Sequence, residues 1–236
     1  MGTRGLTAVV KDGNYLLAQY GQWDHYPGGQ GVTALNFLKS GDLDKAVANL
    51  EARGEFITDE KYDEIAGHIG DGSGWITMEE AEQIDALLPF LSRDLGAGVL
   101  RKIADSEDGP IYLRDQHEFA SDGLFCEYAY LVDLDTNRFE VFVGFQHHDH
   151  TDGRFAALGT EKDFKPEYQG QAYYAPVRLM ASWPLDSLPS EDQFLKTLAG
   201  VERFYTSQRD DYDPADYEDD DVEAITGPVV VDAVLS

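Results

Sequence analysis

Residues 124–145, LFCEYAYLVDLDTNRFEVFVGF, contain the clearest structural pattern of the chain. Strand-favouring side chains alternate on both sides of Asp135-Thr136-Asn137, a tripeptide typical of tight turns. This period of two predicts a β-hairpin, because successive side chains of a strand point to opposite faces. A second hairpin is predicted at the start of the chain, where Leu6–Val10 and Tyr15–Tyr20 flank the turn residues Asp12-Gly13-Asn14.

The segment between the two hairpins has helical periodicity. Residues 42–105 are expected to form a helical region. In this region Thr77-Met78-Glu79-Glu80 has the form of a capping box, and Pro89 is expected to kink or end the helix that starts there. Further helices are expected over Val32–Lys39 and after Pro189-Ser190.

These elements predict an α+β fold, in which an antiparallel sheet is built from the N-terminal and central hairpins and a helical insertion lies in the middle. We expect a single α+β domain over residues 1–209. An acidic segment over 210–223 should stay extended and solvated, because its carboxylates repel one another. A C-terminal strand is expected within 224–236.

The chain is strongly acidic, with 18 Lys and Arg residues against 45 Asp and Glu residues and a net charge of −27. This charge argues against direct binding to nucleic acid, which depends on neutralising phosphates, and against binding to an anionic membrane surface. It favours a protein partner with a basic surface, because a negative field speeds the encounter with a positive groove. The alternative is that the acidity only keeps the chain soluble.

The acidic segment is the first candidate binding site. Its carboxylates could imitate the phosphates of a nucleic acid, and its tyrosines could imitate stacked bases. The residues assigned to this site are Asp211, Tyr212, Asp213, Asp216, Tyr217, Asp219 and Asp220.

A loop rich in aromatic residues and glycine, Gly21–Gly31, is the second candidate binding site. In one interpretation Trp23, Tyr26 and Gly29 let a ligand approach the backbone. The carboxylate of Asp24 would then fix the orientation of the ligand. In the other interpretation Trp23 and Tyr26 fill the core, and Asp24 bonds backbone amides of the turn. The loop has no phosphate-binding fingerprint, since neither GxxxxGK[ST] nor a strand-borne GxGxxG is present.

Two motifs resemble metal sites, although neither is favoured. His148, His150 and Asp152 leave the second hairpin at a spacing of two, and imidazoles with a carboxylate suit zinc. A run of polar residues that leaves a strand is also typical of a solvated loop. Residues 71–80 partly match a calcium loop, but Ile69 would occupy its first ligand position, and the capping box explains its polar residues. We therefore expect no metal and no cofactor.

The composition is that of a cytoplasmic globular protein. Hydrophobic residues make up 42% of the chain. No apolar run approaches the ~18 residues of a membrane span, and the N-terminus shows no signal-peptide pattern. The single cysteine, Cys126, excludes a disulfide within the monomer and is expected to be a buried, inert thiol. The sequence leaves the oligomeric state open.

Several short motifs resemble those of one group of proteins. Met1-Gly2-Thr3-Arg4, followed by Trp23-Asp24-x-Tyr26-Pro27-x-x-x-Gly31, resembles uncharacterised bacteriophage and actinobacterial proteins that begin M-[GC]-T-R and carry a W-D-x-Y-P-x-G-x-G loop. The resemblance continues in Leu124–Tyr130 and in Ala181–Leu185. It implies a phage or prophage origin and brings no activity with it.

A weaker likeness is to N-terminal nucleophile hydrolases of the bile-salt-hydrolase kind, which also open with a short nucleophile segment and a D-G turn. In that chemistry the side chain of the first residue attacks an amide while its free α-amine acts as base. Gly2 has no side chain, so Thr3 would be the nucleophile only after removal of Met1 and Gly2. The alternative is that Thr3 and Arg4 begin an edge strand.

The leading functional hypothesis is an acidic, phage-type accessory protein that binds a basic host protein in the host cytoplasm. Such a protein could act as a counter-defence factor or as an inhibitor that imitates nucleic acid. The first alternative is an amide hydrolase of the N-terminal nucleophile kind, or an inactive relative of one. The second alternative is a structural component of a virion. An enzyme is the less favoured interpretation.

Overall fold

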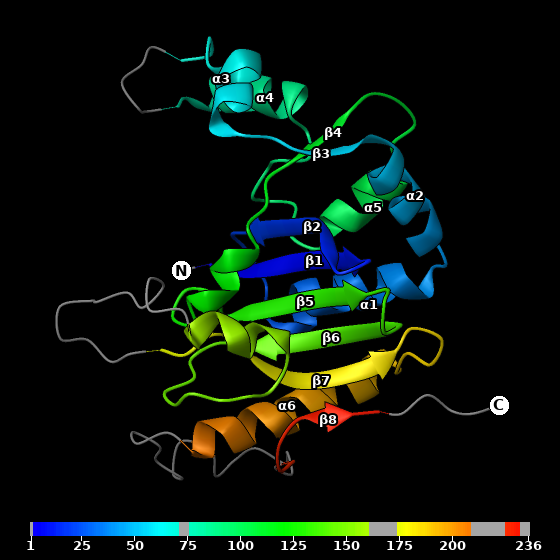
Figure 1. The fold of residues 1–236 in the computed structure, drawn as a ribbon, viewed down its shortest axis with the longest axis vertical. Coiled ribbons are helices and arrows are strands. Elements are labelled where there is room, and N and C mark those ends of the chain that lie inside the picture. Colours follow the sequence, from blue (N-terminus) through cyan, green and yellow to red (C-terminus); the bar gives the residue numbers. More distant parts are fainter. Residues whose placement is uncertain (1, 71–75, 161–173, 209–224, 232–236) are drawn as a thin grey trace, which may run out of the picture.

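The computed structural model describes residues 2–70, 76–160, 174–208 and 225–231. Its main sheet has six strands in the order β2-β1-β5-β6-β7-β8 (Figure 1). The strands are β1 (Gly5–Lys11), β2 (Asn14–Gly21), β5 (Tyr128–Asp133), β6 (Arg138–Val143), β7 (Arg178–Pro184) and β8 (Val229–Val230).

The pairing of these strands confirms both predicted hairpins. β1 and β2 are antiparallel, as are β5 and β6, and β7 adds antiparallel to β6. The sheet is nevertheless mixed, because β1 pairs in parallel with β5 and β7 pairs in parallel with β8. A parallel pair needs a long crossover in place of a tight turn, and the helical insertion between β2 and β5 supplies one. The fold class is α+β with a mostly antiparallel sheet, and β8 lies within the expected C-terminal strand.

Helices cover one face of the main sheet. They are α1 (Val32–Lys39), α2 (Leu43–Arg53), α5 (Gly98–Ala104) and α6 (Glu191–Ser207), of which α1 and α6 lie behind the strands in Figure 1. Each helix contributes to one continuous core with the sheet, for example through Leu35 of α1, Ile103 of α5 and Phe194 of α6. On the sheet, Val9 and Phe139 face this core. This helical face therefore holds most of the buried apolar surface.

The opposite face of the main sheet packs on two 3-10 helices. These are η2 (His117–Ser121) and η3 (Arg154–Thr160), in front of the strands in Figure 1. Leu6 and Ala8 of β1 face this side, while Val9 faces the helices, as the period of a strand requires. Phe142 of β6 meets Phe155 of η3 edge to face, with 4.8 Å between ring centroids.

The longest described helix, α6, follows the predicted pattern. Ser190 and Gln193 form the expected capping box, in which each side chain accepts a hydrogen bond from the other residue's backbone amide. The residues predicted to share one face of this helix are all buried, namely Phe194, Leu198, Val201 and Tyr205. No helix of the described ranges is both long and apolar enough to cross a membrane.

A small lobe projects beyond the edge of the main sheet. It comprises residues 57–70 and 76–88, including α3 (Asp59–Ala66) and α4 (Met78–Leu87), next to the parallel pair β3 (Gly54–Phe56) and β4 (Ile111–Leu113) (Figure 1). The core of the lobe is small, and its buried side chains are Ile57, Ala66 and Leu88. The Thr77–Glu80 capping box is confirmed, and α4 ends before Pro89 as expected.

We call the rest of the described structure, from the main sheet to its covering helices, the body.

The strand β3 lies within the region that is predicted to be helical, so this part of the prediction is wrong. Its residues are exposed, and three of them are too few to show a period of two. Residues 210–223, for which an extended conformation is expected, lie outside the described ranges.

Candidate functional site

The aromatic loop after β2 is held by its own backbone. The amide of Gln30 donates to the carbonyl of Asp24 at 2.7 Å, and the amide of Gly29 donates to the carbonyl of Tyr26 at 2.9 Å. Asp24 has a φ of 59°, in the left-handed region. A Cβ on Gly29 would lie 2.2 Å from the Asp24 carbonyl oxygen, so a side chain does not fit there. These contacts give the loop one well-defined shape.

His25 points from this loop into the interior. Its side chain is completely buried, and its ring lies on the paired residues Gly5 and Gly21 of β1 and β2. A Cβ on Gly5 would be 2.4 Å from His25 Cδ2, and one on Gly21 would be 2.0 Å from His25 Cε1. The ring stacks on Tyr130 with 6.3 Å between centroids, and the Tyr130 hydroxyl donates to the His25 carbonyl. Because neither glycine has a side chain, the imidazole packs directly on their backbone. We call this surface of Gly5 and Gly21 the glycine bed.

Several buried polar atoms surround this bed without partners. Neither ring nitrogen of His25 has a hydrogen-bond partner among the described residues. Two positions further along the strands, the pair Thr7 and Gln19 also leaves the Thr7 Oγ1 and Gln19 Oε1 atoms without partners among the described residues. Burial lowers the pKa of His25 to about 4, against a smaller opposing contribution from the backbone of Trp23. His25 is therefore neutral at neutral pH.

The position of His25 corrects the structural interpretation of the loop. Trp23 and Tyr26 do not fill the core, because each is 46% exposed. The Trp23 indole N–H donates to the Asp94 carboxylate at 2.8 Å, which ties the ring to the surface. The Asp24 carbonyl, and not its carboxylate, accepts the hydrogen bond of the turn. The loop thus presents two exposed aromatic side chains on a defined backbone, and its role in contacting a ligand stays a prediction.

The lobe has the most one-sided charge of the described surface. Its carboxylates are Asp59, Glu60, Asp63, Glu64, Glu79, Glu80, Glu82 and Asp85. Lys61 is the one Lys or Arg among the described lobe residues, and it already pairs with Glu64 at 2.9 Å. Ile76, Met78 and Leu87 lie among these acids with exposed fractions of 55%, 81% and 45%. Acidic and apolar side chains therefore share one small surface.

The other acidic candidate is not positioned by the structure. The residues of the predicted nucleic-acid mimic, from Asp211 to Asp220, lie outside the described ranges. Their role as a binding site stays a prediction.

The structure gives the members of the histidine motif separate partners. The ring Nε2 of His150 is 2.8 Å from the Pro176 carbonyl oxygen, and Asp152 accepts a hydrogen bond from Arg178 at 2.7 Å. His148 is exposed. The regular strand ends at Val143, so the alternation that would align the two imidazoles does not continue. Within the described ranges, no three His, Cys, Asp or Glu side chains are placed to hold one metal ion.

Thr3 lies in the extended segment before β1, and its carbonyl accepts a hydrogen bond from the His25 amide at 3.1 Å. The expectation of an edge strand here is wrong, because β1 lies between β2 and β5. Arg4 starts the parallel pairing, as its carbonyl accepts from the Glu127 amide at 3.0 Å. A role of Thr3 as nucleophile would require a mature chain that begins at this residue, which an intact-mass measurement would detect.

Cys126 is buried, as the sequence analysis expects. Burial raises the pKa of its thiol well above the usual value, and the charges of Asp122 and Glu127 act in the same direction. A thiol held in its protonated form is a poor nucleophile and a poor metal ligand.

Comparisons with protein-family models, with curated proteins and with solved structures find no match to this chain. The resemblance to phage and actinobacterial proteins therefore stays an expectation from the sequence motifs.

Proposed function

We propose that this chain acts by binding a protein with a basic surface, and that the lobe is its main contact surface. The observation that carries the proposal is the combination found on α3 and α4. Eight carboxylates stand there against one lysine that is already paired, beside the exposed Ile76, Met78 and Leu87.

The charges of the lobe would guide the encounter. Like charges on one small surface repel each other, and a cationic partner relieves that repulsion while it is attracted from a distance. Within the described part of the chain, few contacts other than the capping box of Glu80 compete for these acids. Glu64 pairs with Lys61, and Asp59 pairs with Arg114 of the body in a bond whose aspartate side chain is 84% exposed. Exposed pairs of this kind are weak and can be exchanged for a partner's cations.

The apolar side chains would hold the complex once it has formed. Binding energy usually comes from a few desolvated side chains at the centre of an interface, with charged residues around them. Met78 is well suited to such a place, because a flexible thioether adapts to different partner surfaces. Charge alone would give fast association but weak binding. The apolar contacts of these residues would slow dissociation.

On the resemblance described above, the partner would be a basic host protein in the cytoplasm, such as a nucleic-acid-binding or defence factor. Residues 210–223 would supply further carboxylates in place of phosphates. The net charge of −27 disfavours the alternative targets, nucleic acid and anionic membranes.

The test compares two variants with the same change in charge. The lobe variant carries Glu79→Gln, Glu82→Gln and Asp85→Asn, and the control variant carries Glu107→Gln, Glu118→Gln and Asp186→Asn at exposed sites of the body. Basic proteins captured from host lysate by the wild-type chain are identified, purified and returned to the binding measurement.

We expect the lobe variant to associate with the purified partner at least about tenfold more slowly at low salt, with a weaker dependence on salt. The control variant should stay close to the wild type. Equal slowing in both variants would show that only total charge matters, and failure to capture any basic protein would contradict the proposal.

A further inference from the structure

A pocket of about 310 Å³ lies beside the edge strand β2, between the body and the lobe. Its volume suits a small metabolite rather than a peptide. None of its lining residues is acidic, in a chain with 45 Asp and Glu residues. The polar and aromatic residues that line it are Gln19, Tyr20, Tyr62, Arg93, Arg114 and Gln116.

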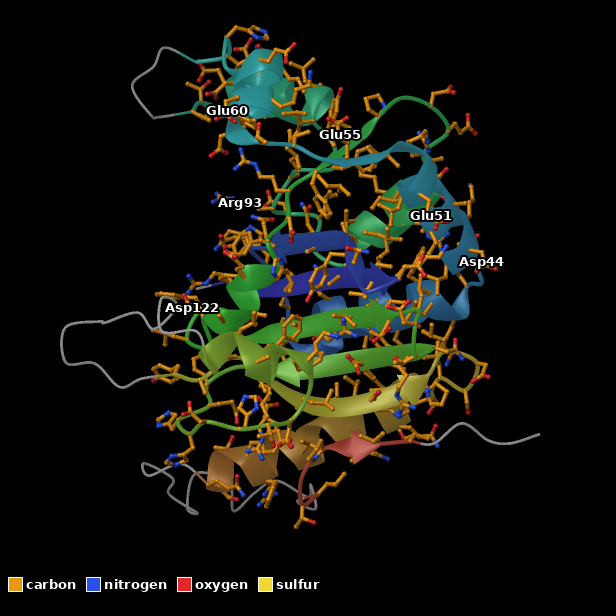
Figure 2. All side chains as sticks on the ribbon, viewed as in Figure 1. Asp44, Glu51, Glu55, Glu60, Arg93 and Asp122 are labelled. Atoms are coloured by element: carbon orange, nitrogen blue, oxygen red, sulfur yellow. The ribbon has the colours of Figure 1, made fainter. Side chains whose placement is uncertain are left out.

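Arg93 gives this pocket a cation that is not neutralised within the protein. Its backbone carbonyl accepts a hydrogen bond from the Gln22 amide at 2.8 Å, which positions the residue at the end of β2. Its guanidinium makes no hydrogen bond or ion pair with any residue in the described part of the chain. Figure 2 shows Arg93 at the junction of the lobe and the main sheet. A guanidinium offers five N–H donors in a planar fork that matches an oxyanion.

Arg114 supplies a second guanidinium whose present partner can be replaced. It lies 3.1 Å from Asp59, whose side chain is 84% exposed, so the pair is well screened by solvent. The same guanidinium covers the ring of Tyr62 with 4.8 Å to the ring centroid, which fixes its plane. An anion in the pocket would meet this group in a defined orientation.

Gln19 provides an independent indication of a ligand. Its side chain is only 2% exposed, and its amide nitrogen donates weakly to the Ser92 carbonyl at 3.4 Å. Its amide oxygen has no hydrogen-bond partner among the described residues. Leaving a buried acceptor unpaired is costly, and Gln19 is a lining residue of the pocket that carries such an acceptor.

The two tyrosines present ring surfaces held by neighbouring residues. Tyr20 meets Phe119 edge to face at 5.0 Å between centroids, and its hydroxyl donates to the Gln22 side chain. Burial raises the pKa of the Tyr20 hydroxyl, and the charges of Arg4 and Arg93 oppose this shift. Fixed aromatic walls beside a cation favour a planar, anionic ligand.

We propose that this pocket binds a small anion that carries a planar ring and an N–H or O–H donor, as a nucleoside monophosphate does. Arg93 and Arg114 hold the anionic group, the ring packs against the tyrosines, and the donor reaches the buried oxygen of Gln19. An aromatic carboxylate shares this chemistry. The site borders the lobe through Tyr62 and the Asp59–Arg114 pair, but its proposed ligand contacts do not depend on the binding of a basic protein.

The experiment uses the full chain and isothermal titration calorimetry at 0.15 M salt. The probes are the four common nucleoside monophosphates, the matching nucleosides, inorganic phosphate and 4-hydroxybenzoate. Arg93→Gln removes the unpaired guanidinium. Lys45→Gln is the matched control, because it removes one exposed cation next to Asp44, on the other side of the molecule in Figure 2. Gln19→Met removes the acceptor at similar size, with a melting curve to check its fold.

We expect at least one ring-bearing anion to bind with a dissociation constant at or below about 1 mM. Arg93→Gln should weaken this binding at least about tenfold, and Gln19→Met about threefold to tenfold. Lys45→Gln should change it less than about twofold.

Three results would overturn the proposal. These are no binding of any ring-bearing anion, equal weakening by Arg93→Gln and Lys45→Gln, and inorganic phosphate that binds as tightly as the mononucleotides. Tighter binding of the mononucleotides than of 4-hydroxybenzoate would assign the anion as a phosphate, and the reverse order would assign it as a carboxylate.

Discussion

The body and the lobe use their side chains in opposite ways. In the body, α1, α2, α5 and α6 all bury apolar residues against the main sheet. In the lobe, α4 buries no residue, and the core consists of three buried side chains with partly buried neighbours. The lobe instead exposes carboxylates and apolar side chains. The body therefore holds the main core of the fold, whereas the lobe leaves most of its side chains exposed, as the proposed contact surface requires.

The largest expected difference between the two regions concerns core truncation. Phe139→Ala should lower the free energy of unfolding by about 3–5 kcal/mol, because the ring is fully buried and stacks on Phe194 at 6.1 Å between centroids. Leu88→Ala removes a buried side chain of the lobe and should lower the global value by less than about 1 kcal/mol, because the lobe can melt locally. Urea unfolding curves followed by far-UV circular dichroism provide the measurement. Equal losses would show that the two regions unfold as one unit.

A second prediction concerns pH and is specific to the body. The pKa of His25 is about 4 when folded and about 6.5 when unfolded, so protons bind preferentially to the unfolded chain between these values. The stabilising contribution that depends on neutral His25 should be fully present above pH 6.5. The free energy of unfolding should then fall by up to about 3 kcal/mol as the pH decreases toward 4. An NMR titration of the His25 ring protons should show a midpoint near pH 4.

Carboxyl groups titrate in the same range, so the stability measurement needs a reference. His25→Phe keeps a ring on the glycine bed without the ionisable group, and its stability should depend less on pH than that of the wild type. A His25 midpoint near 6.5 would contradict the buried position of the ring.

A third prediction tests the glycine bed itself. Gly21→Ala should cost about 1–3 kcal/mol, because the new Cβ would lie 2.0 Å from His25 Cε1. Gly98→Ala is the matched control, since a Cβ there meets nothing within 4 Å and the residue begins α5. It should leave stability unchanged or raise it slightly. Thermal melting measures both, and a similar loss in the two variants would mean that His25 does not press on Gly21.

The smallest expected effects come from the two capping boxes. Ser190→Ala removes the cap of α6 and should lower the global free energy of unfolding by about 1 kcal/mol. Thr77→Ala removes the equivalent cap of α4 and should destabilise only the lobe. The amides of α4 should then exchange faster, while the global free energy of unfolding stays unchanged. A lower global stability for Thr77→Ala, similar to that of Ser190→Ala, would argue that α4 folds together with the body.

The sequence predicts those parts of the fold that depend on neighbouring residues. Both hairpins, the two capping boxes and the buried face of α6 follow from local periodicity and turn chemistry. The parallel pairing of β1 with β5 does not follow from local patterns, because it depends on where the helical insertion brings the chain back to the main sheet. The short strands β3 and β4 escape prediction for the reason that three residues carry no clear period.

The site residues show the same limit. Trp23 and Tyr26 are identifiable from the loop, but the inward position of His25 depends on the Gly5–Gly21 pair in two strands. Two glycines opposite each other in a predicted hairpin leave room for a ring to pack on the strands, and this pattern could have indicated the position of His25. The pocket beside β2 gives no such signal, because Gln19, Arg93 and Arg114 come from separate segments.

The most direct test of the contrast between body and lobe is native-state hydrogen exchange of the free protein. We predict that the amides of α4 exchange through openings of less than about 3 kcal/mol. The amides of β5, at the centre of the main sheet, should exchange only through global unfolding, at roughly 5–15 kcal/mol. Exchange of both sets at the same free energy, with the same dependence on denaturant, would contradict the division of the molecule into a body that holds the main core and a lobe that opens locally.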